Sequence, residues 1–96
     1  MTSIGLVLLL ACAASETSVE QDARSAEQAF AEAAALHGEP AQQAFARAAR
    51  TYESLRRRGV ATPGLCRNEG NAYLLAGDLP RAVLAYRRGL RMAPRD

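Results

Sequence analysis

The segment that most constrains this chain is residues 63–96, where two helical patterns follow each other with a Gly77-Asp78 turn between them. Thr62 is a typical residue for the start of the first pattern, and Pro94 ends the second. A helix pair of this length cannot bury its apolar face by itself, so it needs neighbours to pack against. The segment therefore predicts an interaction module built from antiparallel helices.

Small and apolar residues of the second pattern recur at steps of three and four: Leu79, Ala82, Val83, Tyr86, Leu90 and Ala93. This step is typical of one face of an α-helix, and no run of the chain alternates in the manner of a β-strand. Aromatic residues make up only 5% of the sequence and Trp is absent. We therefore expect an all-α fold whose helices approach closely through small residues. Its few large core members would be Phe30, Phe45, Tyr52, Tyr73 and Tyr86.

Residues 18–59 predict an earlier helix pair. A capping box at residues 17–20 favours a helix start near residue 18, and Gly38 favours its end. A second helix is expected to begin around Pro40 and to end before Gly59. Its apolar stripe consists of Ala41, Phe45, Ala48, Tyr52 and Leu55. Residues 18–96 thus form one helical domain with two antiparallel pairs.

The net charge of +2 hides an asymmetry between the two halves of the chain. Residues 1–55 carry seven acidic side chains and three arginines, a net charge of −4, whereas residues 56–96 carry nine arginines and three acidic side chains, a net charge of +6. A basic second half would attract acidic peptides, anionic lipid or nucleic acid, although a solvated helix face explains it more simply. The triplet Arg56–Arg58 is expected to complement a helix C-terminus and to stay solvated.

Residues 1–17 resemble an export leader that would form an N-terminal signal helix. The apolar run 4–14 is shorter than the roughly 20 residues that span a membrane, and Ala11-Cys12-Ala13 has a small-x-small cleavage pattern. Residues 9–12 also resemble a bacterial lipobox, in which case Cys12 would carry lipid and tether the protein to a membrane. The alternative is that Cys12 is only a small apolar residue of a cleaved signal peptide. Both alternatives predict an exported protein.

No arrangement of residues in the sequence predicts catalysis, a cofactor or a metal. Paired carboxylates, nucleophile–base sets and phosphate-binding glycine loops are not found, and Cys12 and Cys66 lie too far apart for metal-ligand spacing. His37 has no ligand constellation around it. Cys66 is expected to be a small buried apolar residue. Nucleic-acid binding is not expected, since the basic half lacks interleaved aromatic residues.

Several residues at fixed offsets resemble the tetratricopeptide repeat: Gly70, Tyr73, Gly77, Ala82, Tyr86 and Pro94. Residues 63–96 also have that repeat's 34-residue length, and residues 20–59 resemble a degenerate earlier copy in which Ala48 and Tyr52 match Ala82 and Tyr86. The resemblance implies an α-solenoid fragment. In such a repeat, small residues let the two helices approach, and the tyrosines fill the space between successive helices.

Three positions depart from the repeat's usual pattern. Cys66 occupies a site usually held by a large aromatic residue, Glu69 a site of Leu, and Gly89 a site of Ala. We expect Glu69 to weaken packing toward the preceding helix, and Gly89 to cost about 1 kcal/mol relative to Ala.

The leader, the weak first repeat and the run of residues 68–94 together resemble the N-terminal part of bacterial Bat-type aerotolerance proteins. That resemblance implies a location at the periplasm or the cell-envelope membrane, and it implies that the chain is a fragment of a longer protein.

By the same family resemblance, the first helix of each pair lines a concave surface. The side chains facing that groove would be Arg67, Asn68, Asn71, Leu74 and Leu75. Arg67 and Asn71 lie four residues apart and resemble half of a carboxylate clamp, which would suit an acidic or carboxylate-terminated peptide. On the last helix Val83, Tyr86 and Leu90 are expected to stay partly uncovered, so that this face docks on a partner or on a second copy.

The sequence thus predicts a non-catalytic scaffold of the tetratricopeptide type that mediates protein–protein contacts at the cell envelope. The alternative is a peripheral membrane or anionic-surface binder that uses the Arg-rich second half. Binding that vanishes at modest salt concentration would favour the alternative.

Overall fold

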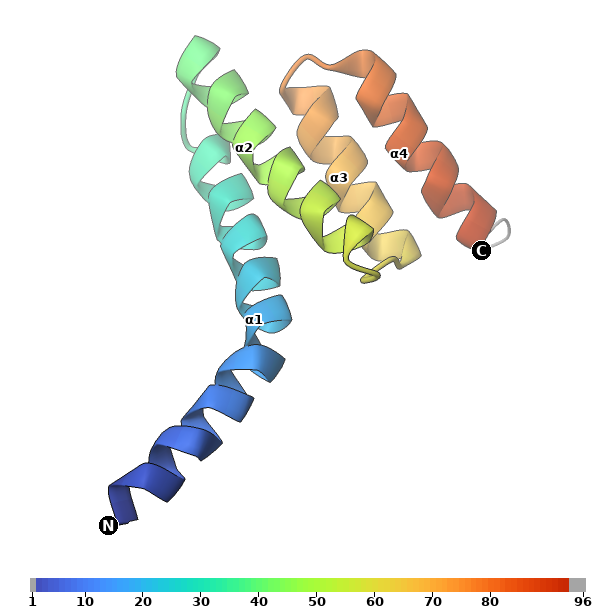
Figure 1. Ribbon diagram of the computed structural model, residues 1–96. Helices are drawn as coiled ribbons and strands as arrows, with labels where there is room; N and C mark the ends of the chain where they lie inside the picture. Colours follow the sequence, from blue (N-terminus) through green and yellow to red (C-terminus); the bar gives the residue numbers. More distant parts are fainter. Residues whose placement is uncertain (1, 94–96) are drawn as a thin grey trace.

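The computed structural model describes the backbone of residues 2–93 and the side chains of residues 18–93. Within this part the elements are α1 (Thr2–Ala34), α2 (Gly38–Arg57), α3 (Pro63–Leu75) and α4 (Leu79–Met92). Consecutive helices pack against each other in antiparallel order, and the described residues contain no strand (Figure 1). The predicted all-α fold with antiparallel helix pairs is therefore confirmed. The side chains of the leader, including Cys12, and residues 94–96 lie outside the described part.

The helix start predicted near residue 18 is not seen, because α1 runs without a break from Thr2. The other predicted ends agree closely. α1 stops four residues before Gly38, and Pro40 lies in the first turn of α2.

Side-chain caps begin α3 and α4 as the sequence predicts. Thr62 Oγ1 accepts a 3.1 Å hydrogen bond from the Leu65 amide, and Asp78 Oδ1 accepts one of 3.2 Å from the Arg81 amide. Each bond satisfies a backbone N–H that has no partner within its own helix. Gly77 follows α3 with a φ of +84°, a left-handed conformation that glycine adopts without steric cost.

The core is made of small residues, as the composition predicts. One buried cluster draws on all the described helices: Ala26, Ala48, Ala49, Tyr52, Ala72, Tyr73 and Ala82. A second lies between α1 and α2, where the Phe30 and Phe45 rings meet edge-on with centroids 5.1 Å apart. Alanine dominates both clusters, so the helix backbones come close together and the aromatic rings fill the remaining space.

Gly70 sets the distance between α3 and α4. A Cβ atom at this position would lie 2.6 Å from Cε1 of the Tyr86 ring, closer than atoms can approach. The ring of Tyr86 thus packs directly on the α3 backbone. Gly89 acts in a similar way on α4, since a Cβ there would lie 3.1 Å from Cβ of Cys66. Glycine at position 89 is expected to lower helix stability relative to alanine. The close approach to Cys66 gives a packing reason for having no side chain there.

Candidate functional site

The outer side of the α3–α4 pair exposes an apolar stripe. On α4, Leu79 is 57% exposed, Val83 47% and Leu90 62%, while Tyr86 between them is half-buried. These positions step by four, three and four along the helix, so they share one face. Leu74 of α3 is 45% exposed and lies one turn after Gly70, against which Tyr86 packs. We call the surface of Leu74, Leu79, Val83, Tyr86 and Leu90 the end face.

A hollow of about 330 Å³ opens in the end face between the start of α3 and the end of α4. It is lined by Pro63, Arg67, Tyr86, Gly89, Leu90 and Ala93. The lining is mostly apolar, and Arg67 is its one charged residue. This chemistry suits an apolar side chain with a negative charge nearby.

The residues predicted to face a groove all lie on α3. Arg67, Leu74 and Leu75 are exposed, and Asn68 and Asn71 are half-buried. Asn71 Oδ1 accepts a 2.5 Å hydrogen bond from the Tyr86 hydroxyl. The amide oxygen of Asn71 is therefore engaged within the protein, and its NH₂ group is the part that remains for a peptide carbonyl. The clamp role itself stays a prediction.

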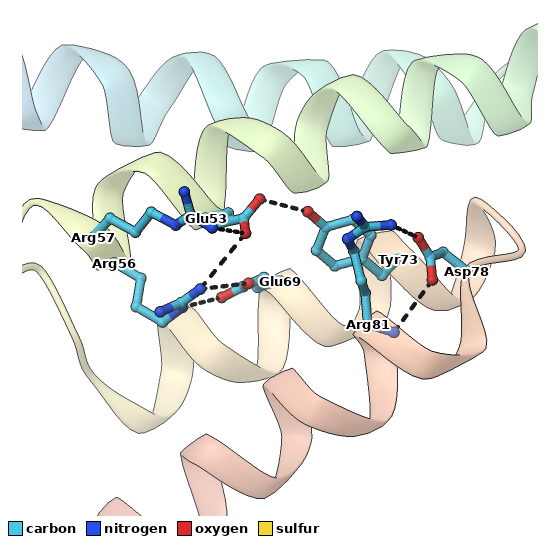
Figure 2. A network of polar contacts seen from close by, with 7 residues as sticks. All are labelled: Glu53, Arg56, Arg57, Glu69, Tyr73, Asp78 and Arg81. Carbon is cyan, nitrogen blue, oxygen red and sulfur yellow. Dashed lines mark hydrogen bonds and ion pairs between the residues drawn. The ribbon is translucent and has the colours of Figure 1, made fainter.

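A buried ion pair joins α2 to α3 (Figure 2). Arg56 Nε donates a 2.9 Å hydrogen bond to Glu69 Oε1, and Arg56 Nη2 reaches Glu69 Oε2 at 3.5 Å. The side chains of Arg56 and Glu69 are only 14% and 2% exposed. Arg56 supplies the opposite charge and the hydrogen bonds that the buried Glu69 carboxylate requires. That Glu69 makes this interface weaker than Leu would stays a prediction.

Glu53, Tyr73 and Arg81 extend the polar contacts toward α4 (Figure 2). The Tyr73 hydroxyl donates a 2.8 Å hydrogen bond to Glu53 Oε2, and the Arg81 guanidinium lies 6.0 Å from the Tyr73 ring centre. Burial, with the Glu53 hydrogen bond as a further cause, raises the pKa of Tyr73 to about 12. Arg81 also pairs with Asp78 at 2.7 Å, and these hydrogen bonds hold the pKa of the Asp78 carboxyl below its usual value.

Of the arginine triplet at the end of α2, Arg57 and Arg58 stay exposed as the sequence predicts, whereas Arg56 is largely buried. Arg57 pairs with Glu53 of its own helix at 3.0 Å. Arg58 forms an ion pair with Asp22 and donates a 3.1 Å hydrogen bond to Ser18 Oγ, both on α1. Together with the Arg56–Glu69 pair, these contacts fasten one end of α2 to both neighbouring helices.

The titratable groups of this network are engaged in structural contacts. No buried side-chain nitrogen or oxygen of the described residues lacks a hydrogen-bond partner. Cys66 is fully buried, and burial raises the pKa of its thiol, which keeps it protonated. Residues 18–93 contain no group of three or more acidic, histidine or cysteine side chains placed to hold a metal ion.

Within the described residues, no helix carries an apolar stretch long enough to cross a membrane. Comparisons of the chain with models of protein families, with curated proteins and with solved structures find no match. The class that the fold defines is a small all-α protein of consecutive antiparallel helices.

Proposed function

We propose that this chain is a non-catalytic helical-repeat module of the tetratricopeptide type that binds another protein. The internal repeat supports the proposal. Ala48 and Tyr52 of α2 precede Ala82 and Tyr86 of α4 by 34 residues, and Ala48, Tyr52 and Ala82 belong to one buried cluster against which Tyr86 packs. Residues separated by the length of one repeat thus occupy corresponding packing positions in the two helix pairs, as expected of a solenoid.

The observation that carries the binding function is the exposure of the end face. Contiguous apolar surface costs free energy in water, and proteins retain it mainly where it contacts a partner. Val83 and Leu90 are about half exposed or more. Where α2 meets α3, Ala49 is buried and Glu53 and Arg56 are largely covered. A partner that covers the end face would bury this apolar surface and be stabilised by it, as α3 is by packing on α2.

The location that we propose is the bacterial cell envelope, with the chain acting as part of a longer scaffold protein. The support for it is the leader pattern of residues 1–17, with Cys12 either lipidated or removed with the signal peptide. Labelling with a radioactive fatty acid distinguishes the two: incorporation that Cys12→Ser abolishes shows the lipid, and its absence in the unmodified chain excludes it.

Site-specific photo-crosslinking in cells tests the binding function. A photoreactive amino acid at position 83 or 90 is expected to capture a discrete protein, because both side chains lie on the end face. The matched control is position 28, which is exposed on α1. The combined variant Arg67→Ala, Asn71→Ala tests the predicted groove in the same assay. Crosslinking no stronger at positions 83 and 90 than at position 28 would count against the proposal.

The second candidate is an anionic-surface binder, favoured by the exposed Arg87 and Arg91 of α4. Binding of this kind is electrostatic, so adsorption to anionic lipid vesicles would fall steeply between low and physiological salt. Protein binding through the apolar end face would persist at the higher salt concentration.

A further inference from the structure

The contact between α2 and α3 shows which kind of element fits the end face. Three residues of α2 face α3: Ala49 is buried in the shared cluster, Glu53 accepts the hydrogen bond from Tyr73, and Arg56 pairs with Glu69. Their counterparts 34 residues later are Val83, Arg87 and Leu90. The end face is therefore the α4 counterpart of the surface that α3 covers on α2. By this correspondence it fits an α-helix.

The differences between the two faces determine the chemistry of that helix. Arg56, which requires a carboxylate from α3, is replaced by Leu90, which requires an apolar side chain and lines the hollow. Glu53, which accepts a hydrogen bond from α3, is replaced by Arg87. A helix that covers the end face would thus place an apolar residue at the hollow and a carboxylate beside Arg87.

The charge around the end face is positive throughout. Arg67, Arg87 and Arg91 are exposed, and none of them forms an ion pair within the described part of the chain. Residues 79–93 contain no acidic side chain. The carboxylates of Glu69 and Asp78 are already paired with arginines. Nothing on this surface therefore neutralises the three guanidinium groups.

We propose that the end face binds an acidic amphipathic α-helix of a partner protein. This rests on the proposed function and adds the chemistry of the partner to it. The apolar stripe of the helix packs on Val83, Tyr86 and Leu90, and its flanking carboxylates pair with Arg67 and Arg87. A second copy of this chain fits less well, because two end faces in contact would bring arginines against arginines.

Two synthetic helical peptides of about five turns test the proposal against the full 96-residue chain. Both carry the same Leu/Ala stripe, flanked by Glu in one peptide and by Lys in the other. Fluorescence anisotropy is expected to show binding of the Glu peptide and at least about tenfold weaker binding of the Lys peptide, since like charges across an interface cost several kcal/mol. The variant Leu90→Gln, at a position 62% exposed, is expected to weaken the Glu peptide about tenfold without unfolding the chain.

A matched pair of charge reversals locates the site. Arg87→Glu and Arg47→Glu change the net charge equally, and both arginines are exposed, but Arg47 lies on α2 outside the end face. Only Arg87→Glu is expected to weaken the binding of the Glu peptide and to strengthen the binding of the Lys peptide. Equal effects of the two reversals would overturn the proposal.

Other results would also overturn it: equal affinity for the two peptides, a dimer that Leu90→Gln dissociates, binding to anionic vesicles in place of the Glu peptide, or a longer form of the protein in which a following helix of the same chain covers Val83 and Leu90. One of these results can be obtained while positions 83 and 90 still crosslink to a protein in cells. In that case the chemistry proposed for the partner is wrong, but the proposed binding function is retained.

Discussion

Arg56 of α2 and Glu69 of α3 form a hydrogen-bonded ion pair of 2.9 Å, with both side chains almost completely removed from water. The pair joins the second helix of the α1–α2 pair to the first helix of the α3–α4 pair. It therefore contributes, with the shared apolar cluster, to holding the α3–α4 pair and its end face against the preceding helices.

Removing one partner of this pair should be far more costly than removing both. Glu69→Ala leaves the Arg56 charge in a largely buried site, and we expect a loss of about 3 kcal/mol in the free energy of unfolding. The double variant Arg56→Met, Glu69→Leu replaces the pair by apolar side chains of similar size and should be close to neutral. Urea unfolding followed by circular dichroism measures both. A Glu69→Ala variant as stable as the parent would show that the pair contributes little.

Gly70→Ala should destabilise the protein, although alanine favours helices. The new methyl group would lie within 2.6 to 2.9 Å of three Tyr86 ring atoms, so the ring or a helix must move. Such overpacking costs about 1–3 kcal/mol. The matched control is Gly64→Ala in the same helix, where the nearest atom is 3.8 Å away, and this variant should be as stable as the parent or more so. Thermal unfolding of the two variants tests whether the close approach of α3 and α4 requires glycine at position 70. Equal unfolding midpoints would exclude that requirement.

Alkaline pH should weaken the fold through Tyr73. Its pKa is raised from 10.0 to about 12 in the folded state, so the unfolded chain loses this proton first as the pH rises. The stabilisation is therefore complete below pH 10 and is lost between pH 10 and 12, with a size on the order of 2 kcal/mol. Urea midpoints at pH 9 and pH 11.5 measure the loss. Tyr73→Phe should show a smaller loss over this interval, and an identical loss in both proteins would assign the effect to other groups.

The hydrogen bond from the Tyr86 hydroxyl to Asn71 should stabilise the end face by about 1 kcal/mol. Tyr86→Phe and Asn71→Ala each break this bond. The double variant should therefore lose less stability than the sum of the single losses. A double-mutant cycle from urea unfolding gives the coupling energy. Strict additivity would mean that the 2.5 Å contact makes no net contribution.

Sequence patterns predicted the helices and most of their ends because these depend on near neighbours along the chain. Thr62 and Asp78 cap helices through amides three residues away, and apolar steps of three and four residues define the packed faces. The exposure of Val83 and Leu90 agrees with the apolar stripe that the sequence predicts on α4. The exposed faces agree with the sequence, whereas the binding roles of Arg67 and Asn71 stay predictions.

Only the tertiary structure decided how the charged residues are used. Arg56 and Glu69 are 13 residues apart, and Arg58 and Asp22 are 36 residues apart, so no local pattern pairs them. A glutamate at an apolar position and a run of arginines each look unfavourable or merely solvated in isolation. Glu69 and Arg56 become a buried ion pair because helix packing brings them within hydrogen-bond distance and removes water. In such a site an unpaired charge is costly and a matched one is tolerable.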